Sequence, residues 1–246
     1  NGTIDILLEP VTEQLTEDLH MVKELLRQQK SVIVLKKLVD LGEYVFIEED
    51  GEPFGNWSGS LPTIEFTSKS GIITRDGSSI FQQTIYPKPR LIVFGAGPDA
   101  RPLVSLAAET GFTVMVCDWR EALCQKKHFP ATTLVIQGFP QDLLKQISFS
   151  PYDFVVIMTH QFKRDQELVR RISNENIRYL GVLGPKERTR RLLNGEEIPK
   201  GMFSPMGTSI GAKGPVEIAV SIVAQMIQVW RKPAHERVEL LWTIPD

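Results

Sequence analysis

The sequence predicts an α/β protein in which a Rossmann-like parallel sheet domain is preceded by a smaller α+β domain. Three observations predict it. Short apolar runs alternate with helical patterns from residue 90 onward, a G-x-G-x-x-A turn joins the first of these runs to a helix, and the residues before 87 show one helix followed by β-rich runs. Strands that alternate with helices imply a parallel sheet with right-handed crossovers.

The smaller domain is expected to begin with an amphipathic helix over residues 11–30, where Leu15, Leu19, Val22 and Leu26 share one stripe. Residues 31–39 and 43–48 are rich in β-formers, so we expect hairpins to follow the helix. A later segment, YPKP at residues 86–89, contains two prolines, which interrupt both helix and sheet. We therefore place the domains at 1–87 and 88–246.

The stretch from Arg90 to Arg120 reads as a strand, a glycine turn, a helix and a second strand closed by an acid. Leu91 to Phe94 suit a strand buried on both faces. In the turn that follows, Gly95 permits the tight bend, Gly97 lets the backbone approach a phosphate, and the small Ala100 lets the helix pack closely. The helix is expected over residues 98–110, with Pro98 at its first position.

Asp118 falls 23 residues after Gly95, close to the offset expected of an acid that binds ribose hydroxyls. Asp99 opposes a pyrophosphate, because both anions favour the positive end of the same helix. Arg101 offsets that conflict, or the ligand carries fewer phosphates than a dinucleotide. Asp118 should repel a 2′-phosphate, and Arg120 compensates in part.

Beyond Asp118 the alternation continues. The sequence predicts strands at 133–137, 152–158 and 178–183, and helices at 141–147, 165–174, 187–193 and 215–229. Ligands of such sheets bind at the carboxyl ends of the strands, so the residues at those ends are the candidates for a site.

His160 is the first candidate, because an imidazole at a strand end next to the hydroxyl of Thr159 moves protons near pH 7. The alternative is a histidine that caps the next helix. Asp165 is either an acid at a helix N-terminus or a group that orients His160, and these two residues are the candidates for catalysis. Lys186 begins a basic run with Arg188, Arg190 and Arg191 that is either a solvated helix face or an anion contact.

Composition excludes several classes of protein. The 246 residues are 42% apolar and 24% charged with a net charge of −2, so nothing draws the chain to nucleic acid or to an anionic membrane. Cys117 and Cys124 are too few for a disulfide framework or a zinc site, and no metal site is expected. The apolar runs are too short to span a bilayer, and we expect a cytoplasmic protein.

Four blocks carry a resemblance to a known family. FGAGPDARPL with VCDWR, VVIMTHQFKRD, YLGVLGPKERTRRLL and SPMGTSIGAKGPVEIAVSIVAQMI resemble the C-terminal domain of the XdhC/CoxI family, the xanthine dehydrogenase accessory proteins, over about residues 89–230. The resemblance implies a Rossmann-like protein that binds molybdenum cofactor, assists its sulfuration and delivers it to an apo molybdenum hydroxylase of the xanthine dehydrogenase type. A cysteine desulfurase is implied as a second partner, with a homodimer as a further possibility.

On this resemblance the cofactor is expected to bind without turnover, with its phosphate at Gly95 and Gly97 and with His160 and Lys186 nearby. The residues expected to contact it are Gly95, Ala96, Gly97, Pro98, Asp99, Asp118, Arg120, Thr159, His160, Gly184, Lys186, Gly207 and Gly211.

The chain also departs from the family pattern. The family's N-terminal domain carries a G-G-C stretch, whereas this chain shows GNWSGSLPTIEF without a cysteine, so the resemblance does not extend to cofactor handling through that cysteine. Within the blocks, the departures are Pro185, Phe203, Thr208, Ser209 and Gln225.

Two other functions stay open. An NAD(P)-dependent oxidoreductase fits the glycine unit equally well, with His160 as acid or base, although no catalytic pair such as Lys with Tyr is evident. A nucleotide-sensing module is the third hypothesis, with the helix at 11–30 as a partner or dimer contact.

Overall fold

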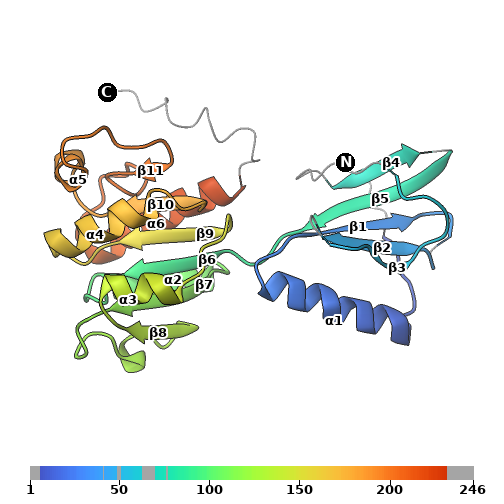
Figure 1. The fold of residues 1–246 in the computed structure, drawn as a ribbon, viewed down its shortest axis with the longest axis horizontal. Coiled ribbons are helices and arrows are strands. Elements are labelled where there is room, and N and C mark those ends of the chain that lie inside the picture. The colour runs from blue at the N-terminus through green and yellow to red at the C-terminus, as the bar shows by residue number, and fades with distance from the viewer. Residues whose placement is uncertain (1–5, 41, 49–50, 63–69, 76, 232–246) are drawn as a thin grey trace. The chain divides into compact units, whose positions relative to one another are not determined.

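A computed structural model describes residues 6–40, 42–48, 51–62, 70–75 and 77–231. The chain divides into two compact units, Asn1–Pro87 and Lys88–Asp246. Figure 1 labels the helices and strands of both. We describe each unit by itself.

The first unit is a five-stranded antiparallel sheet with one helix. The sheet order is β3-β2-β1-β5-β4. Its elements are α1 (Glu13–Arg27), β1 (Val32–Lys37), β2 (Tyr44–Glu48), β3 (Phe54–Asn56), β4 (Gly71–Arg75) and β5 (Ser78–Ile85). The antiparallel pairing between β1 and β2 is the hairpin that the β-rich runs predict.

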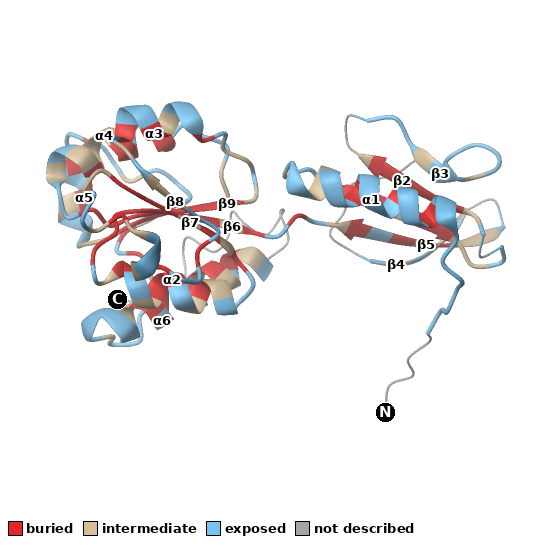
Figure 2. Ribbon diagram, turned by 90° about the horizontal axis from the view of Figure 1, so that it is seen from below, coloured by how far each residue is buried: buried red, intermediate tan, exposed pale blue. Residues whose placement is uncertain are grey.

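Helix α1 begins at Thr12, whose hydroxyl accepts a hydrogen bond from Leu15 N at 3.1 Å. It buries Leu15 and Val22 against the sheet, and Figure 2 shows its buried and exposed sides. The expected position of Leu19 on the apolar stripe is wrong, because that side chain is 44% exposed. Asp18 is buried instead, and the hydroxyl of Tyr44 compensates by donating a hydrogen bond of 2.7 Å.

The second unit confirms the predicted parallel sheet. Its six strands lie in the order β11-β10-β9-β6-β7-β8, with every pairing parallel. They are β6 (Arg90–Phe94), β7 (Thr113–Asp118), β8 (Leu134–Gln137), β9 (Asp153–Ile157), β10 (Tyr179–Val182) and β11 (Met202–Phe203). Since consecutive strands run outward from β6 to one edge and from β9 to the other, this is the Rossmann order.

In the part of this unit that the structure describes, five helices and a short 3-10 turn accompany these strands. The helices are α2 (Ala100–Glu109), α3 (Pro140–Gln146), α4 (Phe162–Ile172), α5 (Lys186–Leu192) and α6 (Gly214–Arg231), and the 3-10 turn covers Lys126–His128. Pro98 is not the first residue of α2, because the Gly97 carbonyl first closes a turn with Ala100 N at 3.0 Å. The helix ends as expected before Gly111, where φ is +97°.

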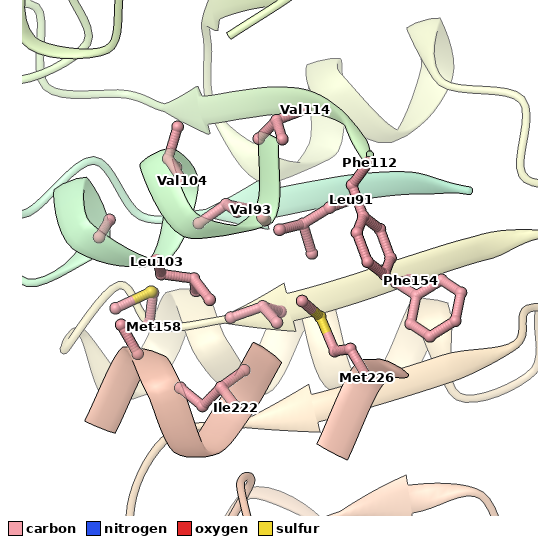
Figure 3. Packing of buried hydrophobic residues seen from close by; sticks show 14 of the residues in the cluster. Leu91, Val93, Leu103, Val104, Phe112, Val114, Phe154, Met158, Ile222 and Met226 are labelled. Carbon is pink, nitrogen blue, oxygen red and sulfur yellow. The ribbon is translucent and has the colours of Figure 1, made fainter. Parts of the chain in front are cut away.

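Each face of the sheet is covered by its own apolar cluster. Alternate strand residues point to opposite faces, so Leu91 and Val93 pack under α2 and α6, while Ile92 and Phe94 pack under α3, α4 and α5. Figure 3 shows the first cluster, which contains Ile222 and Met226 of α6 together with Leu103 of α2. The helix that follows β6 and the helix that follows β9 thus lie on opposite faces of the sheet. The carboxyl ends of these two paired strands are therefore the topological switch point.

Candidate functional site

A cavity of about 250 Å³ opens at this switch point, where α2 and α6 meet the carboxyl ends of β6 and β9. Among the described residues, its wall is apolar except for one carboxylate and one imidazole. The lining residues are Asp99, Leu103, Met158, His160, Leu183, Gly214, Pro215, Ile218, Ala219 and Ile222. In an open α/β sheet this is the place where ligands bind.

Gly95 fixes the glycine loop, residues 95–99 between β6 and α2, against the end of β9. Its φ is +122°, and a Cβ built on it would lie 2.5 Å from the carbonyl oxygen of Met158. No side chain fits such a contact with backbone, so glycine is required here for close packing as well as for conformation. The loop is held on its other side by the hydrogen bond from Gly95 N to Cys117 O, 2.9 Å long.

Asp99 occupies the place that the sequence pattern predicts for a phosphate. Its Oδ1 lies 2.5 Å from the position that a Cβ at Gly97 would take, so the carboxylate folds back over the glycine loop at the start of α2. The positive end of a helix favours this negative charge. The sequence suggested that two anions would compete for this helix end, and the structure places the chain's own carboxylate there.

His160 holds Asp99 from the end of β9. The distance between His160 Nε2 and Asp99 Oδ2 is 2.6 Å, across 61 residues of sequence. The histidine has φ of +62°, a left-handed conformation that is uncommon outside glycine and that often marks functional positions. It does not cap α4, because the cap residue is Gln161.

Asp118 is placed at the end of β7 beside the same loop, but its carboxylate is already saturated. Oδ2 accepts from Ala96 N at 2.6 Å and from Arg120 Nη2 at 2.7 Å, and Oδ1 accepts from Arg120 N and Nε at 2.8 and 3.0 Å. A carboxylate has about four lone-pair sites, so none is left for a ribose hydroxyl.

The pKa of Asp118 reflects this arrangement. Burial by itself raises that pKa, but the hydrogen bonds from the Arg120 side chain and from the N–H groups of Ala96 and Arg120 outweigh it. The net result is a pKa below the ordinary value of 3.8. The residue thus acts as a structural anion that ties β7 to the glycine loop.

Asp165 is an acid in the first turn of α4 and does not orient His160. It accepts a hydrogen bond from the hydroxyl of Thr159 and pairs with Arg188 Nη2 at 2.5 Å. Thr159 is 2% exposed and Asp165 1%. The three side chains therefore fix the ends of β9 and α5 to each other, and Arg188 has its charge satisfied inside the protein.

The remaining predicted residues lie outside the cavity lining. Pro98 and Lys186 are exposed, and Gly184 packs against the side chain of Arg188. Gly207 is held by Gln225, whose Oε1 accepts from Gly207 N at 2.8 Å, and Gly211 has open space around it. Of the glycines in that loop, Gly214 lines the cavity.

The sequence interpretation missed the apolar wall. Ile218 and Ile222 form it together with Leu103 of α2, yet nothing in the local pattern of α6 distinguishes them from ordinary core residues. The only local signal is the Gly214-Pro215 start of α6, because it predicts a helix beginning at a loop near the strand ends.

Neither cysteine is exposed for chemistry. Cys117 and Cys124 are both free and buried, and burial raises the pKa of each thiol. A thiol with a raised pKa is a poor nucleophile. Within the described ranges no group of three or more His, Cys, Asp or Glu side chains is arranged to hold a metal ion, and no helix there has both the length and the apolarity to cross a membrane.

Comparison with protein families identifies two segments. Residues 91–226 match the XdhC Rossmann domain, and residues 13–86 match a domain described as BH1974-like, central domain. The chain belongs to the XdhC family. This family match covers the whole glycine loop, the Asp99–His160 pair and most of α6.

Two curated proteins are similar to this chain. A protein of Bacillus subtilis described as a probable xanthine dehydrogenase subunit is 40% identical over 237 residues, which are 95% of this chain and 71% of the relative. The uncharacterized protein YqeB of Escherichia coli is 31% identical over 173 residues, 64% of this chain and 32% of that protein. A crystal structure described as a xanthine dehydrogenase from Bacillus halodurans superposes with a TM-score of 0.77 at 43% identity, covering 91% of this chain and 66% of the other.

The segment GNWSGSLPTIEF lies inside the match to the central domain. Its sequence pattern resembles the place of the cysteine-bearing N-terminal domain of the family, whereas the domain that residues 13–86 match is described as central. Residues 63–66 of that segment also lie outside the described residues.

Proposed function

We propose that this protein is an accessory protein for the maturation of a xanthine dehydrogenase-type molybdenum hydroxylase. The observation that carries the proposal is the match of residues 91–226 to the XdhC Rossmann domain, laid on a sheet with a cavity at its switch point. In this proposal the protein binds molybdenum cofactor in the cytoplasm, assists its sulfuration and passes it to the apo hydroxylase. A homodimer stays a prediction.

The residues of the site fit one end of such a cofactor. The aminopyrimidinone ring at the pterin end is planar and carries N–H donors, and the cavity offers apolar walls from Leu103, Ile218 and Ile222 with the acceptor oxygens of Asp99. The phosphate end does not fit at Gly95 and Gly97 while Asp99 lies over Gly97. We therefore revise the expected orientation, so that the ring enters the cavity and the phosphate stays outside the glycine loop.

When bound, the cofactor supplies the molybdenum centre that the client hydroxylase uses. The protein's own side chains bind and protect it: the apolar walls exclude water, Asp99 accepts hydrogen bonds, and His160 fixes the carboxylate from the other side. Because Cys117 and Cys124 are buried, the sulfur for sulfuration has to come from a partner, for which a cysteine desulfurase is the proposed source.

No observation favours the nicotinamide alternative. A dinucleotide needs the loop over Gly97 for its pyrophosphate and a free acid for its ribose. Asp99 lies over Gly97, where the pyrophosphate would bind. The Asp118 carboxylate is saturated by Arg120 and Ala96. The proposal therefore rests on a carrier function rather than on hydride transfer.

The test uses anaerobic titration of the full chain with molybdenum cofactor, followed by activation of apo hydroxylase. Ile218→Trp is designed to fill the cavity, and we expect it to weaken cofactor binding about tenfold or more. Val220→Trp on the same helix is the matched control, because Val220 is 46% exposed and outside the cavity lining. Two results together would contradict the proposal: the unaltered protein does not bind the cofactor, and cells without this protein keep full hydroxylase activity.

A further inference from the structure

We infer that Asp99 determines which ligands enter the switch-point cavity. Its carboxylate excludes pyrophosphate from the glycine loop and selects a planar heteroaromatic ring with N–H donors along one edge, as in an aminopyrimidinone. The inference rests on the proposed function, because it concerns the same cavity. It goes further by assigning specificity to one side chain.

The exclusion follows from the position of the carboxylate. A Rossmann loop binds pyrophosphate because Gly97 lacks a side chain and the start of α2 is positive. Asp99 Oδ1 fills the space beside Gly97 and brings a negative charge to the same helix end. Ala96 N, the neighbouring loop donor, is already bonded to Asp118 at 2.6 Å. A phosphate therefore meets both occupied space and a like charge.

The selection follows from the hydrogen-bond capacity that remains. His160 Nε2 bonds to Oδ2, which fixes the carboxylate, while Oδ1 makes no hydrogen bond with any residue that the structure describes. Asp99 is also the only acid among the described residues that line the cavity. An acceptor in an apolar wall favours a ligand whose ring edge carries donors.

The size of the cavity limits the enclosed part of the ligand to a single ring system. Its volume of about 250 Å³ lies below the ~300–1,000 Å³ typical of pockets that enclose drug-sized ligands. Leu103, Ile218 and Ile222 supply apolar contact on the α2 and α6 sides. A pterin or a guanine ring presents the required donor edge, and these two sources share the chemistry.

The test is calorimetry on the full chain with 6-hydroxymethylpterin, guanosine, ADP and NAD as probes. Asp99→Asn removes the charge and keeps the volume, whereas Asp99→Ala removes both. Asp142→Asn is the matched control, because Asp142 is an exposed acid in the first turn of α3, outside the cavity lining. Asp99 makes no helix-cap hydrogen bond, so we expect its variants to fold, and melting curves check this.

We expect the unaltered protein to bind at least one ring compound and to bind ADP and NAD about tenfold more weakly or not at all. Asp99→Asn should weaken ring binding about tenfold. Asp99→Ala should bind ADP about tenfold more tightly than the unaltered protein, with Asp99→Asn between them. Binding of either ring supports the inference, and preference for the pterin over guanosine identifies the source.

Two results would overturn the inference: equal affinity of the unaltered protein and Asp99→Ala for ADP, or ring binding that Asp99→Asn leaves unchanged. Failure of the ring compounds to bind, in a protein that still activates apo hydroxylase with cofactor, would refute the inference and leave the proposed function intact. Ring binding that depends on Asp99, in a protein that hydroxylase maturation does not need, would refute the function and support the inference.

Discussion

Two carboxylates flank the glycine loop, and the protein uses them in opposite ways. Asp118 has no exposed side-chain surface and all of its acceptor capacity is used by Arg120 and Ala96. The side chain of Asp99 is 25% exposed, pairs with the exposed His160 and lines a cavity. The difference teaches that an acid near a Rossmann loop indicates a ligand site only when the fold leaves its oxygens unsatisfied.

The largest effect should come from replacing Gly95, which packs against the backbone at the end of β9. Gly95→Ala puts a Cβ 2.5 Å from the Met158 carbonyl at a φ of +122°, so we expect the free energy of unfolding to fall by about 3–5 kcal/mol. Gly111→Ala is the control, since Gly111 has a φ of +97° but no atom lies within 4 Å of a Cβ built on it. We expect this variant to lower the free energy of unfolding by about 1–2 kcal/mol. Urea denaturation followed by circular dichroism measures both. Equal effects of the two variants would show that the contact with Met158 is unimportant.

Asp118→Ala should have the next largest effect. It leaves the Arg120 guanidinium and the buried Ala96 N–H without their acceptor, and we expect a loss of about 2–3 kcal/mol because Arg120 remains partly solvated. The same denaturation experiment measures it. A loss below about 0.5 kcal/mol would mean that Asp118 is not the structural anion described above.

The acid limb of the stability curve sharpens the comparison. The pKa of Asp118 is lowered in the folded protein, so its contribution is present above the ordinary pKa of 3.8 and is lost as pH falls through the lowered folded value. We expect the difference in unfolding free energy between the unaltered protein and Asp118→Asn to be constant near neutrality and to shrink below pH 3.8. A difference that grows as the pH falls would show that the pKa of Asp118 is not lowered in the folded protein.

The smallest effect on stability should come from Asp99→Ala. Its pair with His160 is partly exposed and worth little, so we expect a change of less than about 1 kcal/mol in unfolding free energy. The contrast with Asp118→Ala is the measurement that matters. Similar losses for the two variants would remove the distinction between a structural and a ligand-facing carboxylate.

Much of the fold was predictable because it depends on local patterns. The continuous apolar run at Leu91–Phe94 and its successors predict strands buried on both faces, and the structure confirms a parallel sheet. Strand β11 was missed because it has two residues, too few for any pattern. Asp18 shows the other limit: an acid on a buried helix face makes sense only when Tyr44, 26 residues later, lies opposite.

The candidate site was predictable in its place but not in its contacts. The rule for strand ends brings Asp99, Asp118 and His160 to the same edge of the sheet. It does not say that Asp165 pairs with Arg188, that Gly207 is held by Gln225, or that α6 supplies the apolar wall. Those contacts join segments far apart in the chain, and no local periodicity encodes them.

By itself, the sequence determined the alternation of elements, the glycine turn and the set of acids and bases at the strand ends, because each follows from residue type and spacing along one segment. Only the tertiary structure decided which of those groups remain available. Hydrogen-bond satisfaction depends on the donors that packing brings within about 3 Å. In this chain, the Asp118 carboxylate accepts hydrogen bonds from Arg120, whereas Asp99 lines the cavity.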